Sequence, residues 1–124
     1  MTGEEGQRRD GLRVTTSFFE VGKLMVHSER EGDLHTIYVR GELDLATAHD
    51  LERELIKVED TDALSIILDL SDLEFIDSTG VRVLLSAHAR SRANSNRLTL
   101  LRGSAAVQRV FEVTGILNLL PFAN

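Results

Sequence analysis

The sequence predicts a single-domain α/β sandwich with a mixed sheet of four to five strands and about three to four helices. Segments with strand-like and helix-like periodicity alternate along the chain from residue 24 onward. A short, continuous apolar run at residues 63–68 has the pattern of a central strand that helices cover on both faces. The chain has 124 residues, of which 42% are hydrophobic, and this suits one domain with one core.

The N-terminal part of the chain predicts a tail followed by a hairpin. Residues 1–17 contain three glycines among charged residues and little apolar material, so we expect a mobile tail there and a folded domain over residues 18–124. Residues 24–28 and 35–40 are strand-like, and the second segment alternates with a period of two. The turn-like residues 31–33 between them predict a hairpin at the edge of the sheet.

Three helices are expected after this hairpin. Thr47 and Asp50 have the spacing of a capping box, and apolar residues then recur at steps of three and four. A second helix is expected directly after Asp77, and residues 97–101 follow it as a strand. Ser104 can cap a third helix.

Residues 68–80 carry the most informative pattern of the chain. We interpret them as a buried strand that runs into an acidic loop, which ends in the paired hydroxyls of Ser78 and Thr79 at the start of a helix. Because the carboxyl ends of parallel strands face one edge of a sheet, acids that follow several strands are expected to surround Ser78. These acids are Glu42, Asp44, Asp69, Asp72, Glu74 and Asp77.

The hydroxyl of Ser78 has two compatible roles. Either Asp77 or Ser78 can cap the helix by accepting backbone N–H bonds. A helix N-terminus also offers free N–H groups and a positive dipole end that tolerate a phosphate. A phosphate on Ser78 would add about −1.5 to −2 charges beside Asp77. Repulsion and desolvation of about 3 kcal/mol would then weaken partner binding roughly a hundredfold, so phosphorylation is expected to switch docking off without refolding the domain.

Composition argues against several other classes of function. The net charge of −6 and the pI near 5.1 disfavour nucleic acid as a direct partner. The chain has no cysteine for a disulfide or for a zinc site of the CxxC type. No apolar run reaches the ~18 residues of a membrane span. We therefore expect a cytoplasmic protein with no nucleic-acid partner and no membrane partner.

Catalysis is not expected. A hydrolase would need a base within about 3 Å of Ser78, but His88 lies ten residues further along the same helix, which is ~15 Å away. The chain has no GxSxG, HExxH or phosphate-binding glycine motif, so we expect no catalytic residue, no metal site and no cofactor. A receiver-like phosphoacceptor domain is an alternative, because Asp69 follows a strand and a carboxylate cluster could hold magnesium. However, no lysine follows Lys57 to hold the phosphoryl oxygens.

Three motifs, in order and at the right spacing, resemble one known family. They are Gly-Glu-Leu-Asp at residues 41–44 followed by Thr-Ala at 47–48, the stretch from Leu-Asp-Leu at 68–70 to Phe-Ile-Asp-Ser-Thr-Gly at 75–80, and Val-Gln-Arg-Val-Phe at 107–111 followed by Thr-Gly-Ile at 114–116. Together they closely resemble the STAS domain of bacterial anti-sigma factor antagonists, over about residues 19–122.

The resemblance implies a function and a set of site residues. In that family, an anti-sigma factor that is itself a serine kinase phosphorylates the serine of the Asp-Ser-Thr-Gly motif, which is Ser78 here. Thr79 is the fallback acceptor. The unphosphorylated antagonist binds the kinase and frees the sigma factor, a phosphatase resets the serine, and ATP and magnesium belong to the kinase. The partner-binding residues expected on this basis are Glu42, Asp44, Asp77, Ser78, Thr79, Gly80 and Arg82.

The role of Arg82, the oligomeric state and a second interpretation of function stay open at this point. Arg82 stands where the family often has a small residue, so it is expected either to change which kinase is recognised or to give the phosphate a local counter-charge. The sequence leaves open whether the chain forms a weak homodimer. A STAS module of a stress-signalling scaffold or of a transport complex is the second interpretation of function.

Overall fold

The computed structural model describes residues 13–123, which contain five strands, three α-helices and one 3₁₀ helix. No helix in this part of the chain is both long and apolar enough to cross a membrane. In chain order the elements are β1 Val14–Val21, β2 Leu24–Glu31, β3 Leu34–Leu43, α1 Ala48–Glu59, β4 Ser65–Ile76, α2 Ser78–Ala93, β5 Leu98–Leu101, α3 Ala105–Val113 and η1 Leu117–Leu119.

The five strands form one mixed sheet in the order β1-β2-β3-β4-β5. β1, β2 and β3 pair antiparallel, whereas β3, β4 and β5 pair parallel. The parallel pairs are made possible by the crossovers through α1 and α2. The predicted α/β domain with a mixed sheet is confirmed, as is the hairpin of β2 and β3.

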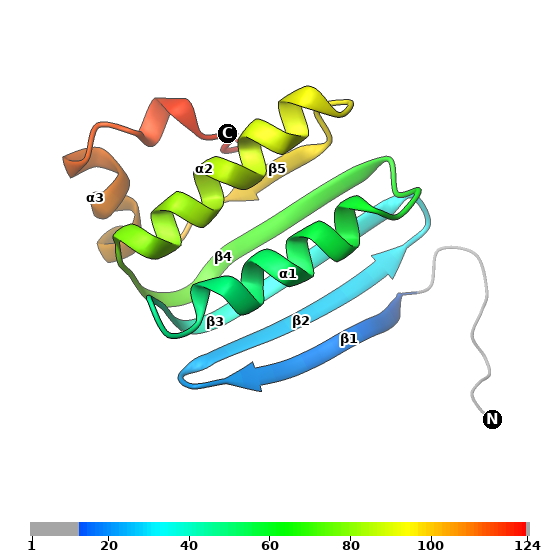
Figure 1. Cartoon of the computed structure of the whole chain (residues 1–124), viewed down its shortest axis with the longest axis horizontal. Coiled ribbons are helices and arrows are strands. Elements are labelled where there is room, and N and C mark those ends of the chain that lie inside the picture. Colours follow the sequence, from blue (N-terminus) through cyan, green and yellow to red (C-terminus); the bar gives the residue numbers. More distant parts are fainter. Residues whose placement is uncertain (1–12, 124) are drawn as a thin grey trace.

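Helices α1 and α2 lie side by side over one face of the sheet (Figure 1). On this face Ile66 and Leu68 of β4 are buried, and they join the core formed by the apolar stripes of the helices. Ile67 points to the opposite face and is only partly buried, and Leu64 is exposed. The expectation that helices cover both faces is therefore wrong, because two apolar residues of the run at 63–68 do not enter the core.

Strand β1 extends the sheet beyond the expected edge hairpin. Residues 14–17, which the sequence assigns to a mobile tail, pair with β2, so the tail prediction is wrong for them and the described fold begins at Val14. This part of β1 is stabilised by backbone pairing and by hydroxyl groups rather than by apolar burial. For example, the Ser17 hydroxyl donates to the Glu54 carboxylate at 2.7 Å. Residues 1–12 of the predicted tail lie outside the described residues.

Strand β4 includes most of the predicted acidic loop. It continues to pair with β3 up to the pair Leu43 and Ile76, with two shifts of register on the way. The buried positions change their spacing from two residues to three between Leu70 and Leu73. This irregularity hides the strand from a period-two pattern, and the loop assignment before Ile76 is wrong.

The C-terminal segment closes the other edge of the sheet. The Leu100 amide donates to Pro121 O at 2.9 Å, and the Ala123 amide donates to Leu100 O at 2.9 Å. The predicted cap of α3 is confirmed, since Ser104 Oγ accepts from the Val107 amide at 3.3 Å. The two edges of the described sheet therefore differ from each other. Strand β1 has no further neighbour within the described residues, whereas β5 pairs on its outer side with the C-terminal segment.

Candidate functional site

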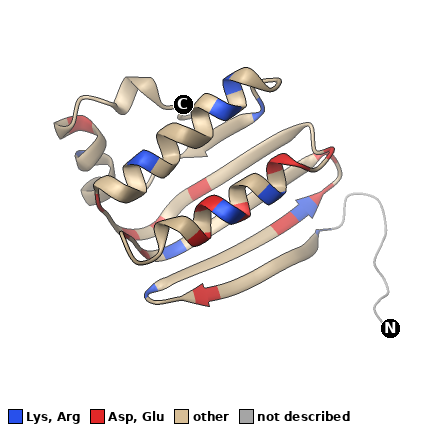
Figure 2. Cartoon of the chain, viewed as in Figure 1, with Lys and Arg blue, Asp and Glu red and all other residues tan. Residues whose placement is uncertain are grey.

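The candidate site lies where β3 and β4 end. The two strands are parallel and pair at Leu43 and Ile76, so the chain leaves both strands at the same edge of the sheet. Asp44 follows the first strand and Asp77 follows the second. Helix α1 begins after the first loop, and α2 begins directly after Asp77 (Figure 1). Acidic residues lie on both connections (Figure 2), as expected for a ligand or partner site at this edge.

Asp77 joins the two connections with one carboxylate. Its Oδ1 accepts from the amides of Thr79 at 2.9 Å and Gly80 at 3.1 Å, which makes Asp77 the N-cap of α2. Its Oδ2 accepts from the Leu45 amide at 3.0 Å. Asp77 therefore fixes the start of α2 and the loop after β3 relative to each other.

Ser78 is left free by this arrangement. It is the first residue of α2 and is exposed, and its side chain makes no hydrogen bond within residues 13–123. Because Asp77 is the cap, the capping role that the sequence leaves open for Ser78 is not used. Thr79 is only partly exposed, so Ser78 is the more accessible of the two hydroxyl groups.

Gly80 has a structural reason to be glycine. It is buried, and a Cβ on Gly80 would lie 2.8 Å from Ile76 Cγ1 and 2.9 Å from Leu43 Cγ. Such distances are shorter than normal contacts between carbon atoms. Gly80 thus lets the first turn of α2 rest against the ends of both strands. It positions Ser78 from beneath the surface.

Thr47 organises the loop between β3 and α1, which the sequence does not predict. It is 1% exposed, and its hydroxyl donates to Glu42 O at 3.0 Å and accepts from the Asp44 amide at 2.9 Å. The Asp44 carboxylate in turn accepts from the Ala46 amide at 3.0 Å. The Thr47 side chain makes no capping bond to α1. The predicted capping box of Thr47 and Asp50 is therefore wrong, because the hydroxyl bonds the loop.

Two exposed apolar side chains flank Asp77 and Ser78. Leu45, whose amide bonds Asp77, is 71% exposed, and Phe75 is 49% exposed. Phe75 pairs with Glu42 at the end of the sheet. Exposed apolar groups beside polar ones are common features of protein–protein interfaces. Neither residue is among the predicted site residues, although an apolar residue directly after an acid at a strand end is a usable signal.

Arg82 is exposed on α2, four residues after Ser78. Residues at this spacing are neighbours on a helix surface. Within residues 13–123 its guanidinium forms no hydrogen bond and no ion pair, so it is available to a group on Ser78 or to a partner.

The backbone N–H groups at the start of α2 are largely occupied. The amides of Thr79 and Gly80 donate to the Asp77 carboxylate, and the Val81 amide donates to Asp77 O at 3.0 Å. The expectation that free N–H groups await a phosphate is wrong for these three amides. Arg82 is therefore the group in the first turns of α2 that can offset a negative charge on Ser78.

The remaining acids of the predicted cluster lie on β4 itself and not on the two connections beside Ser78. Asp69 pairs with Tyr38 of β3 and Leu101 of β5 and so lies within the sheet. Asp72 and Glu74 are exposed on β4. The acids that the structure brings to the site are Glu42, Asp44 and Asp77. Within residues 13–123, no group of three or more His, Asp or Glu side chains is placed to hold a metal ion.

His88 lies further along α2 and is not part of the site. Burial, and then the positive charge of Arg92, lower the pKa of His88 below its ordinary value. Its buried Nδ1 has no hydrogen-bond partner in the described part of the chain. His88 thus lies at the boundary of the core, where burial disfavours its charged form.

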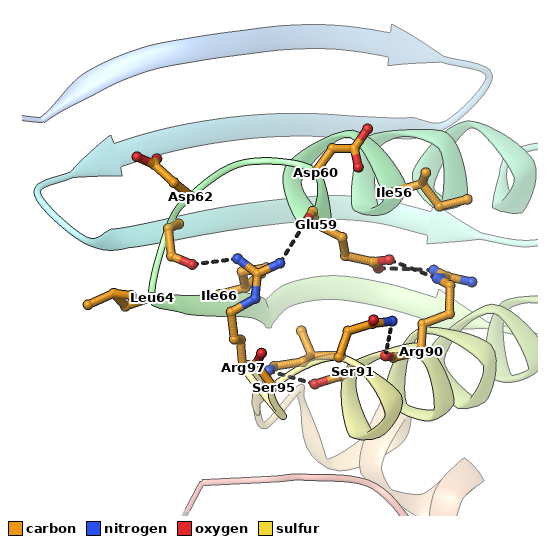
Figure 3. A pocket seen from close by; sticks show the side chains of 13 residues that line it. Ile56, Glu59, Asp60, Asp62, Leu64, Ile66, Arg90, Ser91, Ser95 and Arg97 are labelled. Atoms are coloured by element: carbon orange, nitrogen blue, oxygen red, sulfur yellow. Dashed lines mark hydrogen bonds and ion pairs between the residues drawn. The ribbon is translucent and has the colours of Figure 1, made fainter.

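A separate pocket of about 690 Å³ lies at the opposite end of β4 (Figure 3). It contains two arginines that are already paired. Arg97 donates to Thr61 O at 3.1 Å, and Arg90 donates to the Glu59 carboxylate at 2.8 Å. The first arginine holds the end of α1, and the second joins α2 to α1. This pocket therefore has a structural role and does not contribute to the site at Ser78.

Comparisons with known proteins agree with this geometry. The family described as "STAS domain" matches residues 26–124. The anti-sigma-B factor antagonist of Listeria monocytogenes is 30% identical over 77% of this chain and 84% of its own length. Among solved structures, the anti-sigma factor antagonist SpoIIAA in its unphosphorylated form has 25% identity and a TM-score of 0.66, over 80% of this chain and 88% of that one. Phosphorylated SpoIIAA from Bacillus has 22% identity and a TM-score of 0.56, over 90% and 92%. The chain therefore belongs to the STAS family of anti-sigma factor antagonists.

Proposed function

We propose that this antagonist binds an anti-sigma factor serine kinase through the surface around Ser78 and is released when Ser78 is phosphorylated. The observation that carries the proposal is that Asp77 caps α2 and leaves the exposed Ser78 hydroxyl without a partner in residues 13–123. The existence of SpoIIAA in unphosphorylated and phosphorylated forms supports it. We define the Ser78 surface as Glu42, Asp44, Leu45, Phe75, Ser78, Thr79 and Arg82.

The Ser78 surface has the composition of a reversible docking site. Leu45 and Phe75 supply exposed apolar contact area, and the acids Asp44 and Glu42 are their neighbours in the chain and in the sheet. A few buried apolar anchors within a polar rim carry most of the energy of typical interfaces. Asp77 and Gly80, which the sequence assigns to partner binding, act from beneath by fixing the backbone on which Ser78 and Leu45 stand.

In the proposed reaction, Ser78 is a substrate. Its Oγ forms a bond to the γ-phosphorus of ATP held by the kinase, ADP leaves with the bridging oxygen, and the hydroxyl proton passes to a base of the kinase. ATP and magnesium therefore belong to the partner, and the chain itself needs no cofactor and is not an enzyme. A phosphatase would hydrolyse the phosphoserine and restore the hydroxyl.

The local charge explains why phosphorylation of Ser78 is expected to weaken partner binding. The phosphate adds about −1.5 to −2 charges on a surface that already carries Glu42 and Asp44. The amides of Thr79 and Gly80 are occupied by Asp77, so these two N–H groups do not help to neutralise the added charge. A penalty of about 3 kcal/mol corresponds to roughly a hundredfold weaker binding. Arg82 reduces this penalty when it pairs with the phosphate.

Capture from the native lysate with paired baits tests this function. Ser78→Ala is expected to retain a kinase that Ser78→Asp loses, because the first leaves the charge of the surface unchanged and the second adds a negative charge. Ser65→Asp is the matched control, since Ser65 is exposed at the opposite end of β4. The captured protein, given ATP, should phosphorylate the wild-type chain at Ser78 as mapped by mass spectrometry. Labelling at another residue, or equal capture by Ser78→Ala and Ser78→Asp, would contradict the proposal. The proposed role places the chain in the cytoplasm with its partner.

A further inference from the structure

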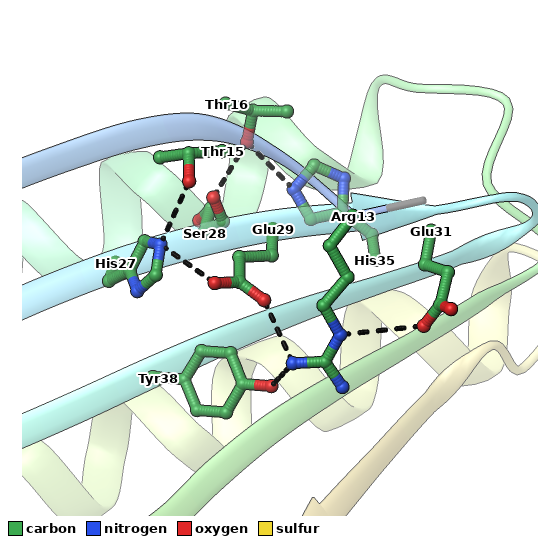
Figure 4. Close-up of polar contacts among 9 residues, drawn as sticks. All are labelled: Arg13, Thr15, Thr16, His27, Ser28, Glu29, Glu31, His35 and Tyr38. Atoms are coloured by element: carbon green, nitrogen blue, oxygen red, sulfur yellow. Dashed lines mark hydrogen bonds and ion pairs between the residues drawn. The ribbon is translucent and has the colours of Figure 1, made fainter. Parts of the chain in front are cut away.

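A polar cluster with three buried members, Ser28, His35 and Glu54, attaches the edge strand β1 to the domain. The hydroxyls of Ser17 and Ser28 donate to the Glu54 carboxylate of α1 at 2.7 and 2.6 Å. Thr16 lies at the shift of register in β1, donates to Ser28 O at 3.2 Å, and places its hydroxyl 3.3 Å from His35 Nε2 (Figure 4). We call these five residues, Thr16, Ser17, Ser28, Glu54 and His35, the β1 latch.

Strand β1 depends on this latch because it buries little else. None of its eight residues is fully buried, and Phe19 and Val21 pack only partly against the core. In contrast, Val26 of β2 and Ile37 of β3 are completely buried. Elements with few buried apolar contacts open at lower free energy than the rest of a domain. β1 is therefore the strand expected to separate first.

His35 is a buried titratable group that contacts Thr16 of β1. It is 4% exposed, and burial, followed by the positive charge of Arg30, lowers its pKa below the ordinary value, with Glu54 opposing them. Its buried Nδ1 has no partner within residues 13–123. A protonated ring would thus hold an N–H donor without an acceptor. Separation of β1 removes Thr16 from Nε2 and lets water reach the ring.

The other charged groups around His35 come from two elements. Arg30 of β2 is paired with Asp62 at 2.8 Å, so its charge is partly neutralised. Glu54 of α1 lies 3.5 Å from Lys57. From β1 itself, the group facing His35 is the uncharged Thr16.

We propose that β1 is a detachable edge strand and that proton uptake by His35 drives its release. The attached state keeps His35 neutral. In the detached state the ring is exposed, and it binds a proton when the pH falls below the ordinary histidine pKa of about 6.5. The latch is therefore intact above this pH and weakens as pH falls toward the lower pKa of the attached state. One extra proton in the detached state raises the opening equilibrium by up to about tenfold per pH unit. Release uncovers the outer edge of β2, and this device is independent of the function proposed for Ser78.

His27 is a matched control within the same strand pair. It lies on the opposite face of the sheet, with Nε2 3.4 Å from the hydroxyl of Thr15 of β1 and 3.2 Å from Glu29 (Figure 4). Its side chain is more exposed than that of His35. Both histidines thus contact a threonine of β1, but the proposal assigns the pH response to His35.

Amide hydrogen exchange by NMR on the full chain between pH 7.5 and 5.0 tests the proposal. After correction for intrinsic exchange, the protection of β1 amides relative to β4 amides should fall by up to about tenfold per pH unit below 6.5. His35→Gln should remove this slope, and His27→Gln should keep it. Titration of the His35 ring in the wild-type chain is a second readout that needs no variant, and it should follow the same pH range. Constant β1 protection, an equal loss in β4, or an unchanged slope in His35→Gln would overturn the proposal.

Discussion

Gly80 rests against the end of β3 so closely that any side chain would overlap Leu43: a Cβ on Gly80 would lie 2.9 Å from Leu43 Cγ and 3.0 Å from Leu43 O. This contact sets the first turn of α2, and hence Ser78, relative to the loop that follows β3. The shape of the proposed docking surface therefore depends on a residue that lies below it.

Gly80→Ala is expected to destabilise the domain by about 1–3 kcal/mol, because overpacking forces shifts of side chains or backbone. Urea unfolding measures this change. In the double variant with Leu43→Ala the two effects should be less than additive, since the smaller residue 43 relieves part of the overlap. Full additivity, or a fully stable Gly80→Ala chain, would show that the close approach is not a constraint.

Asp77→Asn should separate the two tasks of the Asp77 carboxylate. Asparagine is a good N-cap, so the bonds to the Thr79 and Gly80 amides are kept. However, an amide NH₂ in place of Oδ2 cannot accept from the Leu45 amide, and the loss of this bond costs about 0.5–1.5 kcal/mol. Hydrogen exchange at the Leu45 amide should become faster while exchange in α2 stays slow. Unchanged exchange at Leu45 would mean that the bond across the two connections is not significant.

Leu45→Ser and Phe75→Ser should each weaken binding of the partner by tenfold or more, because exposed apolar anchors contribute more than about 1.4 kcal/mol when a partner buries them. Both side chains are exposed in the free chain, so the melting temperature should change little. Val113→Ser, at an exposed apolar position on α3, is the control. Loss of affinity in the control but not in the two variants would place the docking surface elsewhere.

Glu54→Gln should lower the free energy of unfolding at pH 7 by about 1–3 kcal/mol, since a buried carboxylate with two hydroxyl donors is replaced by a neutral amide. Burial raises the pKa of Glu54, but the hydrogen bonds from Ser28 and Ser17 and the charge of Lys57 together lower it below its ordinary value of 4.5. The ionised group therefore stabilises the fold above pH 4.5, and this contribution is lost as pH falls through the lower pKa of the folded state.

Urea unfolding between pH 7 and pH 3 measures this dependence for Glu54. The difference between the wild-type chain and Glu54→Gln should shrink below pH 4.5. Glu112→Gln, at an exposed position on α3, should show no such trend. A difference that is constant over the whole range would rule out the contribution of the Glu54 charge.

Much of the architecture can be predicted from the sequence, because the relevant signals are local. The apolar stripe of α1, the hairpin of β2 and β3, and the cap at Ser104 each depend on spacing within one element. β1 cannot be found in this way, since its attachment depends on Glu54, which is 37 residues from Ser17. The irregular register of β4 likewise removes the alternation on which strand prediction depends.

The candidate site is only partly predictable for the same reason. Its motif leads to Ser78 as the candidate acceptor, and the resemblance to the STAS family leads to the edge of the sheet where β3 and β4 end. However, the sequence does not distinguish Asp77 from Ser78 as the cap, and it assigns Thr47 to a helix cap when the hydroxyl instead bonds the loop. The hydrogen bonds of these residues depend on contacts between the loop after β3 and the start of α2. Such contacts cannot be predicted from residue spacing along the chain.

We propose above that phosphorylation of Ser78 releases the partner. The most direct test is the affinity of the captured anti-sigma factor for the unphosphorylated chain and for the same chain phosphorylated at Ser78, measured by calorimetry at one ionic strength. We expect binding roughly a hundredfold weaker after phosphorylation, with a still larger loss in Arg82→Gln, which lacks the local counter-charge. Equal affinities for the two forms would contradict the proposal.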